Sequence, residues 1–261
     1  MCISFKKGMA SEKRTLEWCL ENYPNHIRSV KRMIGAIKTK IDINPNSKIL
    51  EIGAAQGMTI FALKGLGYKD VSGIEPFREA TEVLKKLSSK LNMIVDIKCE
   101  SAENTNLRPN EYDLIIATSV MEHVSNDRKV FDKVFKSLKP GGAFYFTSAS
   151  TLCLYQGEIR LFPFFSWYPD KLKKSIILWA SKKHPALVNY TKTPAINWYS
   201  PRKVRKIANN LGFKQILNRW DLITPEYGAK KNIIVKIGKS CRLMGLLIDC
   251  VIPTCRFLLI K

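Results

Sequence analysis

Several hallmarks of common protein classes are missing from this sequence. Its seven cysteines form no Cys-x-x-Cys pair and fit no zinc-ribbon spacing, so we interpret them as reduced thiols of a cytoplasmic protein and expect no metal site. The N-terminus has no long apolar stretch typical of a secretory signal. No run of about 18 uncharged apolar residues occurs either, so we expect no transmembrane helix.

Acidic side chains are scarce at both ends of the chain. Residues 1–48 carry 10 Lys/Arg against 4 Asp/Glu, residues 49–150 carry 13 against 13, and residues 151–261 carry 20 against 5. Basic flanks around a neutral centre favour an anionic partner, which can be a phospholipid surface, a phosphate-bearing substrate or nucleic acid. The alternative is a lysine-rich surface that serves only solubility, but such a bias should not spare the middle of the chain.

The neutral centre alternates short apolar strands with helical stretches, as in βαβ units. The strands are predicted at 48–52, 71–74, 94–98, 112–118 and 143–147, with helices at 57–66, 78–91 and 127–138 between them. The continuously apolar Leu114–Ala117 fits a strand buried on both faces. We therefore predict an α/β fold with a Rossmann-like, seven-stranded, mostly parallel sheet and helices on both faces.

The remaining segments divide the chain further. Residues 1–47 form a predicted N-terminal helical segment with a break at Pro24, and residues 48–150 form the core. Residues 151–196 interrupt the rhythm as an aromatic and basic insertion. Residues 197–238 resume it with a helix at 202–211, capped by Ser200 and Pro201 and ended by Gly212, and with strands at 214–223 and 232–237. Residues 239–261 are predicted to be an amphipathic basic tail that follows the completed fold.

Two glycines open the first helix of the core. Gly53 and Gly57 lie where the first strand ends, a position at which backbone can approach a ligand. Glu75 ends the next strand and can accept hydrogen bonds from ribose hydroxyls. The G-x-G-x-x-G pattern of dinucleotide sites is absent, and the Glu51 carboxylate would repel a pyrophosphate. The combination predicts a nucleoside ligand with a cationic end; tight-turn glycines and a solvent-facing carboxylate are the simpler alternative.

These stretches resemble class I S-adenosylmethionine-dependent methyltransferases, of the small-molecule type related to the ubiquinone-biosynthesis O-methyltransferases. The similar stretches occur in family order: "ILEIGAAQG", "VSGIEPF", "CESAEN", "YDLIIATSVMEHV", "LKPGGAFYFTS" and "NWYSPRKVRKIANNLGF". They cover residues 48–150 and about 197–237. As a set they are specific for the family, although no single one is.

The resemblance implies a role for each matching residue. Glu51 would face the methionine amino group of the cofactor, and Glu75 with the adjoining Pro76 would lie at the ribose. The other matching positions would surround the methionine, ribose and adenine parts of the cofactor: Gly53, Ala55, Gly57, Ser101, Ala102, Glu103, Thr118 and Ser119. Ala55 replaces a family glycine and is tolerable if its φ is negative. Ser101 replaces a frequent aspartate, which leaves the adenine amine to a backbone carbonyl or water.

The acceptor side is less defined by the sequence. His123 is one of three histidines and follows the fourth strand, so it is the candidate general base for a hydroxyl acceptor; packing at a helix start is the alternative. In this family the insertion 151–196 covers the acceptor pocket, and here it interleaves aromatic residues with lysines. Together with Leu243–Ile248 and Phe257–Ile260 of the tail, this composition suits the headgroup zone of an anionic membrane.

We therefore expect O-methylation of a hydrophobic or lipid-linked acceptor by a cytoplasmic protein bound peripherally to a membrane. A polyprenyl-type quinone precursor or a lipid-linked glycan would fit. An RNA methyltransferase, in which the rings stack on bases, is one alternative. The others are a catalytically inactive membrane-binding protein with this fold, and a lid and tail that simply pack on the domain.

Overall fold

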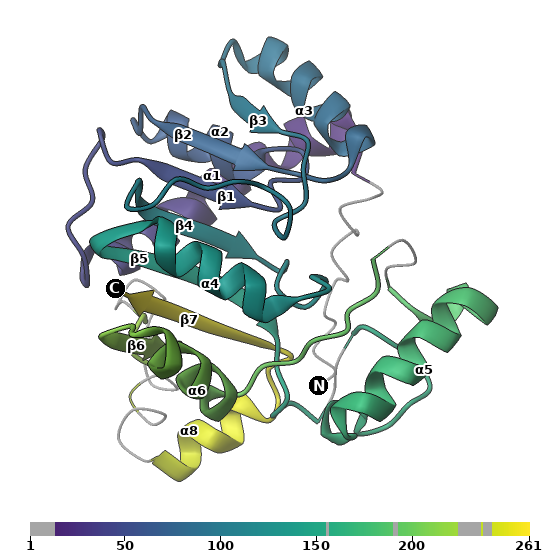
Figure 1. Ribbon diagram of the computed structural model, residues 1–261. Helices are drawn as coiled ribbons and strands as arrows, with labels where there is room; N and C mark the ends of the chain where they lie inside the picture. Colours follow the sequence, from purple (N-terminus) through teal and green to yellow (C-terminus); the bar gives the residue numbers. More distant parts are fainter. Residues whose placement is uncertain (1–13, 155–156, 190–192, 224–235, 237–241) are drawn as a thin grey trace.

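The computed structural model describes residues 14–154, 157–189, 193–223, 236 and 242–261 (Figure 1). Seven strands form a single sheet in the order β3-β2-β1-β4-β5-β7-β6. All neighbouring strands are parallel except β7, which runs antiparallel to both β5 and β6. Their bounds are β1 Ile49–Ile52, β2 Val71–Ile74, β3 Asp96–Lys98, β4 Tyr112–Thr118, β5 Leu138–Ala149, β6 Gln215–Asn218 and β7 Thr254–Ile260.

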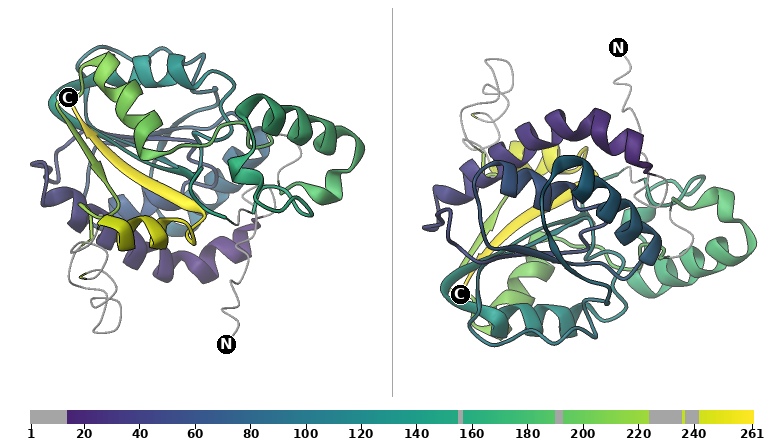
Figure 2. Two further views of the ribbon diagram at one scale, coloured as in Figure 1. Left: turned by 90° about the horizontal axis from the view of Figure 1, so that it is seen from below. Right: turned by 90° about the horizontal axis from the view of Figure 1, so that it is seen from above.

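Helices cover both faces of this sheet. Figure 2 shows α4 and α6 on one face and α1 with α8 on the other. The buried side chains form a separate apolar core on each face, one with Phe131 of α4 and Val204 of α6, the other with Ile34 of α1 and Ile60 of α2. The helices are α1 Leu16–Lys38, α2 Met58–Gly65, α3 Arg78–Leu91, α4 Asp127–Ser137, α5 Asp170–Lys183, α6 Pro201–Leu211 and α8 Arg242–Asp249. The predicted seven-stranded α/β fold is confirmed.

The central strands are apolar because both of their faces are covered. Every residue of β1 is buried, and Leu114–Ala117 of β4 are fully buried. The register pairs Glu51 with Gly73 of β2 and with Ile116 of β4. A carboxylate is thereby placed in the middle of the sheet, one residue before the end of β1.

The capping residues expected for α6 are confirmed. Ser200 accepts a hydrogen bond from the Lys203 N–H at 3.1 Å, and Pro201 is the first helical residue. Gly212 ends the helix at φ 95°, a conformation that costs a residue with a Cβ about 1–2 kcal/mol. This helix therefore begins and ends where its own sequence dictates.

The predicted break at Pro24 is wrong. Helix α1 continues through Pro24, which is exposed. Side chains on both sides of the proline pack against the domain, with Cys19 before it and Val30 after it buried. In addition, Tyr23 donates its hydroxyl to the Phe61 carbonyl of α2 at 3.0 Å. Tertiary contacts thus hold the helix together against the lost hydrogen bond of the proline.

The prediction for the C-terminal tail also needs correction. Phe257–Ile260 do not lie at an interface with solvent or lipid but are buried in β7, between β5 and β6. Of the two predicted closing strands, the first is confirmed in shortened form as β6, and the second, at 232–237, lies outside the described residues except for Lys236. A short apolar run predicts a buried strand, but its position in the sheet depends on long-range pairing.

The insertion between β5 and α6 forms a projection of its own. Figure 1 shows α5 beyond the edge at which the parallel strands end. Phe165, Ile177 and Trp198 form a small core that holds α5 against the domain. Lys173, one of the lysines of this insertion, is fully buried. It pairs with Asp170 at 2.8 Å and lies 4.7 Å from the centre of the Trp198 ring.

Candidate functional site

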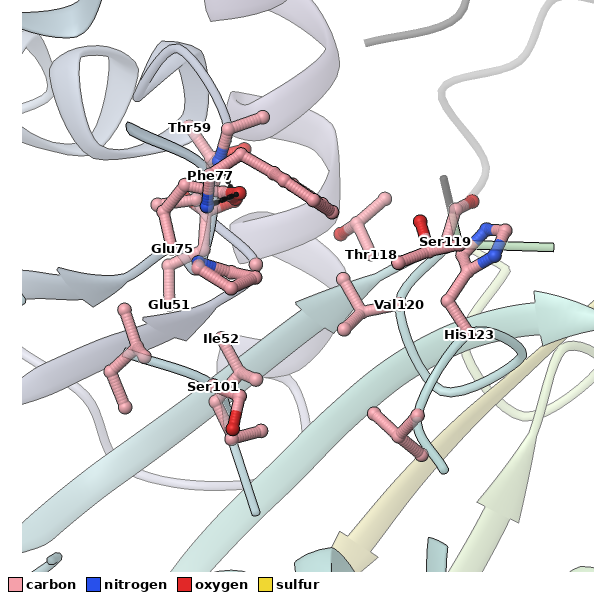
Figure 3. Close-up of a pocket in the computed structure, with 18 of the residues that line it drawn as sticks. Glu51, Ile52, Thr59, Glu75, Phe77, Ser101, Thr118, Ser119, Val120 and His123 are labelled. Carbon is pink, nitrogen blue, oxygen red and sulfur yellow. Dashed lines mark hydrogen bonds between the residues drawn. The ribbon is translucent and has the colours of Figure 1, made fainter. Parts of the chain in front are cut away.

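The strand ends of β1, β2 and β4 surround a pocket of about 580 Å³, a size typical of small-molecule sites. Figure 3 shows Glu51, Thr59, Glu75 and Phe77 on one side of it and Thr118, Ser119 and His123 on the other. Among the predicted site residues, Gly57 does not line the pocket, whereas the others do: Glu51, Gly53, Ala55, Glu75, Pro76, Ser101, Ala102, Glu103, Thr118, Ser119 and His123. The sequence motifs therefore converge in space, while the role of each residue stays a prediction.

The two glycines are required by packing as well as by backbone conformation. Gly53 has φ 72°, and a Cβ there would lie 2.3 Å from Cγ2 of Val120. Gly57 has φ 75°, and its Cβ would lie 2.7 Å from Cδ1 of Leu84. A side chain at Gly53 would therefore displace the loop after β4, which forms the opposite wall of the pocket.

Ala55 does not keep the negative φ on which its tolerance was argued. Its φ is 48°, and Ser119 across the pocket has φ 55°. Residues with a Cβ in this region carry strain that the surrounding structure must offset. At Ala55 the offset includes a hydrogen bond, because its N–H donates to Oε2 of Glu75 at 2.7 Å.

Glu75 ties together the two loops on the β1–β2 side of the pocket. Its second oxygen accepts from the Phe77 N–H at 3.0 Å. Burial raises the pKa of Glu75, and the two backbone N–H groups oppose this rise by stabilising the charged form. The carboxylate is thus fixed at the end of β2, the position from which it would meet ribose hydroxyls.

Glu51 is the more deeply buried carboxyl group of the pair. Burial raises the pKa of Glu51 to about 8, although hydrogen bonds from Thr59 and from the Ile60 N–H favour the charged form. Its Oε2 atom finds no hydrogen-bond partner among the described residues. A buried acceptor without a partner on the wall of a pocket fits the amino group of S-adenosylmethionine. Glu51, Gly53, Ala55 and Glu75 are therefore the residues that would hold the methionine and ribose parts.

The segment after β3, predicted to flank the adenine, forms another wall of the pocket. Ala102 is buried and Ser101 is half-buried, as suits a wall for a flat base. Glu103 has a structural partner, because its Oε1 accepts from the N–H of Ser125 at 2.7 Å and from its hydroxyl at 2.9 Å. This bond joins the loop after β3 to the loop after β4 and occupies one oxygen of the Glu103 carboxylate.

His123 lies where the loop after β4 meets the end of the insertion. Burial lowers the pKa of His123, and the nearby backbone of Thr193 and Pro194 opposes this fall. A neutral imidazole can accept a proton on its unprotonated nitrogen and so act as a base. Thr193 also lines the pocket, so the insertion contributes to the site beside the candidate base.

The neighbouring Glu122 points elsewhere. Its Oε2 accepts from the Ser148 hydroxyl at 2.6 Å, and burial raises the pKa of Glu122 to about 8. Within the described ranges no group of three or more His, Cys, Asp or Glu residues is placed to hold a metal ion. The same ranges contain no helix that is long and apolar enough to cross a membrane.

Sequence reasoning missed three residues of the pocket wall. Arg14, just before α1, His26 on α1 and Thr59 on α2 all line the pocket. Thr59, the second residue of α2, could have been found from its place just after Gly57. His26 and Arg14 lie far from the other motifs in sequence and reach the pocket only because α1 packs on α2.

Comparisons with known proteins agree with this geometry. The family model described as "Methyltransferase domain" matches residues 15–217. A ubiquinone biosynthesis O-methyltransferase from Nitrobacter winogradskyi is 30% identical over 105 residues, which are 40% of this chain and 38% of that protein. The alignment with that curated relative thus spans less than two fifths of its length.

Solved structures show the same fold at low sequence identity. An S-adenosylmethionine-dependent methyltransferase from Mesorhizobium loti has a TM-score of 0.56 at 12% identity and covers 97% of this chain and 100% of its own. Phosphoethanolamine N-methyltransferase 2 from Haemonchus contortus, solved with S-adenosylhomocysteine, has a TM-score of 0.56 at 14% identity, with 88% of this chain and 52% of that chain covered. The chain therefore belongs to the methyltransferase-domain family, whose cofactor is S-adenosylmethionine.

Proposed function

We propose that this chain transfers a methyl group from S-adenosylmethionine to a hydroxyl oxygen of a hydrophobic or lipid-linked acceptor at an anionic membrane surface. The observation that carries the proposal is the aromatic and basic projection beside the pocket. It presents large apolar side chains to solvent, with exposed fractions of 84% for Leu161, 54% for Phe164, 57% for Trp167 and 48% for Trp179. The exposed lysines of α5 lie on the same projection: Lys171, Lys174, Lys182 and Lys183.

This surface suits lipid because rings and positive charges alternate on it. The rings of Phe164 and Trp167 stack at 5.9 Å, so they form one apolar tip. Aromatic side chains are stable in the headgroup zone of a bilayer, and each nearby lysine adds about 1 kcal/mol on an anionic leaflet. Helix α8 adds further exposed apolar residues, with Leu243 at 63% and Leu247 at 54%.

His123 would serve as the base for the transfer. When bound, the cofactor supplies a methyl group on a positively charged sulfur. The neutral His123 ring would accept the hydroxyl proton as the acceptor oxygen takes the methyl group, and the cofactor would leave as the neutral thioether. The Thr193 and Pro194 contacts would hold the ring in one orientation during this step.

The names of the curated relatives support an oxygen acceptor. The Nitrobacter winogradskyi protein and others that match are ubiquinone biosynthesis O-methyltransferases. A quinone precursor with a polyprenyl chain would combine a reactive hydroxyl with a membrane anchor. The exposed apolar projection would bring the pocket to such an acceptor without extracting it from the bilayer.

The proposal is tested by titrating the protein with S-adenosylhomocysteine and then sedimenting it with vesicles that contain anionic lipid. We expect both to bind, and we expect Phe164→Ser together with Trp167→Ser to reduce vesicle binding about tenfold. Ile94→Ser is the matched control, because Ile94 is 91% exposed but lies outside the projection. Both variants should retain their affinity for S-adenosylhomocysteine.

The outcomes separate the alternatives. Cofactor binding without vesicle binding would contradict the membrane role, and a steep salt dependence of binding to RNA in that case would favour an RNA acceptor. Binding of cofactor and vesicles without turnover on any polyprenyl phenol or lipid-linked glycan would favour an inactive membrane-binding protein. Absence of cofactor binding would overturn the enzymatic assignment itself.

A further inference from the structure

Three side chains from three different elements lie next to one another at the wall of the pocket. Nε2 of His26, on α1, lies 3.3 Å from the Thr59 hydroxyl on α2. The Thr59 side chain in turn favours the charged form of the Glu51 carboxyl group on β1, as a hydrogen-bond donor does. All three line the pocket, and Glu51 is only 4% exposed and Thr59 8%. Nothing in the cofactor motifs of the sequence includes His26 or Thr59.

The direction of these bonds follows from the single proton of a hydroxyl group. If Thr59 donates to a charged Glu51, it has no second proton for His26 and must accept from it. The His26 ring then carries its proton on Nε2. Burial, together with the nearby Arg14 charge, lowers the pKa of His26 to about 4, so the ring stays neutral and has only one N–H to place. The direction of the whole chain is thereby linked to the charge of Glu51.

The free protein favours an uncharged Glu51. Burial is the main reason, and the charge of Glu75 at the end of β2 acts in the same direction, while Thr59 and the Ile60 N–H oppose it. With a pKa of about 8, Glu51 is mostly protonated at pH 7. An ammonium group beside the Oε2 atom would reverse this balance, because an opposite charge at close range favours the ionised carboxyl group.

We propose that His26 and Thr59 are positioning residues of the cofactor site. His26 donates a hydrogen bond to Thr59, and Thr59 donates one to the Glu51 carboxylate, which receives the amino group of S-adenosylmethionine. Binding at neutral pH then releases the Glu51 proton to solvent. The proposal rests on the assignment of this cofactor. It makes helix α1 part of the binding machinery rather than only a cover for the sheet.

The proton release depends on pH through Glu51. At pH 7 the Glu51 proton is lost on binding and the ligand amino group is already charged, so most of one proton is released. At pH 9 Glu51 is already charged in the free protein, so binding no longer releases its proton. Release of the Glu51 proton should therefore fade as the pH rises through about 8.

The test is calorimetric titration in buffers of different ionisation enthalpy, which counts the protons exchanged. S-adenosylhomocysteine is the first probe, because it has the amino group without the charged sulfur, and 5′-methylthioadenosine is the second, because it has neither. We expect proton release at pH 7 with the first probe and none with the second. Glu51→Gln should bind S-adenosylhomocysteine more weakly and release no proton.

The relay itself is tested at Thr59. Thr59→Val removes a bond that favours the charged Glu51, so affinity at pH 7 should fall about fivefold and its rise with pH should shift to higher pH. Thr59→Ser should restore both. Thr81→Val is the matched control, because Thr81 is a buried threonine of α3 outside the pocket. Nitrogen chemical shifts of His26 should show the Nε2–H tautomer in the complex.

Each result decides between two statements. Binding of S-adenosylhomocysteine without proton exchange at pH 7, or with the same exchange in Glu51→Gln, would overturn the relay while leaving the cofactor assignment intact. An Nδ1–H tautomer of His26 in the complex would also overturn it. Failure of both probes to bind would instead refute the cofactor assignment on which the inference rests.

Discussion

The two sides of the pocket are built in different ways. The side predicted to hold methionine and ribose comes from residues 51–77, a short stretch in which Glu51 and Glu75 are each 4% exposed and Glu75 is bound by two backbone N–H groups. The opposite side joins Thr118 and Ser119, also predicted at the cofactor, and the candidate base His123 to Thr193 near the end of the insertion. The first side is specified locally, whereas the second depends on how the insertion packs against the domain.

Among variants that test the difference between the two sides, we expect the largest effect on activity from a change at the candidate base His123. His123→Gln should lower kcat on a confirmed hydroxyl acceptor by about 100-fold or more, while the Kd of S-adenosylhomocysteine stays unchanged. Because burial lowers the pKa of His123 below its usual value, the wild-type base is unprotonated at pH 7. Wild-type kcat should fall only when the pH drops through that lowered pKa, and the variant should lose this acid limb. An unchanged kcat would refute the base assignment.

The next largest effect is expected on stability, at Gly53, where the two sides of the pocket meet. In Gly53→Ala the new Cβ must adopt φ 72° and would lie 2.3 Å from Val120, so we expect a loss of about 2–4 kcal/mol in the free energy of unfolding. Denaturant titration measures it. Since Val120 also lines the pocket, the affinity for S-adenosylhomocysteine should fall as well.

Gly67 is a control that separates the cost of a positive φ from the cost of the contact with Val120. Gly67 has φ 94°, but a Cβ there would meet nothing within 4 Å. Gly67→Ala should therefore cost only about 1–2 kcal/mol. Adding Val120→Ala to Gly53→Ala should recover part of the difference. Equal losses at Gly53 and Gly67 would show that the contact with Val120 does not matter.

A smaller effect is expected within the ribose side. Glu75→Ala removes the acceptor for the N–H groups of Ala55 and Phe77. The Kd of S-adenosylhomocysteine should rise about tenfold or more, as for other hydrogen bonds to a charged group. Glu75→Gln, which keeps one carbonyl oxygen, should lose less. An unaltered Kd for Glu75→Ala would contradict the ribose role.

The smallest effect is expected from two neighbouring lysines of α5. Lys174 is exposed and Lys173 is fully buried, yet both are lysines of α5. Lys174→Gln should weaken binding to anionic vesicles about fivefold without changing stability. Lys173→Gln breaks the contact with Asp170 and should instead lower the free energy of unfolding. If both variants lose vesicle binding equally and neither loses stability, the division between surface and core lysines is wrong.

The sequence predicted which residues between Glu51 and Glu75 come together because the signals there are local. A strand, a glycine turn and a strand-end acid determine the geometry of Glu51, Gly53 and Glu75 almost by themselves. Two details still went wrong there. Ala55 has a positive φ of 48°, which the Glu75 hydrogen bond offsets, and Gly57 packs against Leu84 instead of lining the pocket.

The errors elsewhere concern contacts between distant segments. Pro24 does not interrupt α1, because packing on α2 outweighs the missing hydrogen bond. The apolar run of the tail is β7, which pairs with Leu138–Ala149 on one side and with Gln215–Asn218 on the other. His26 joined the site only through α1. Periodicity reports that a segment is buried but not which neighbour buries it.

By itself the sequence determined the α/β class, the order of the cofactor motifs and the basic flanks, because strand patterns, helix caps and charge are properties of short segments. Only the tertiary structure decided that the last strand lies between β5 and β6, that Lys173 is buried while Lys174 is exposed, and that His26 contacts Thr59 at the pocket. The physical reason is that burial and hydrogen-bond partners across a pocket arise when elements distant in sequence pack together, and no local propensity contains that information.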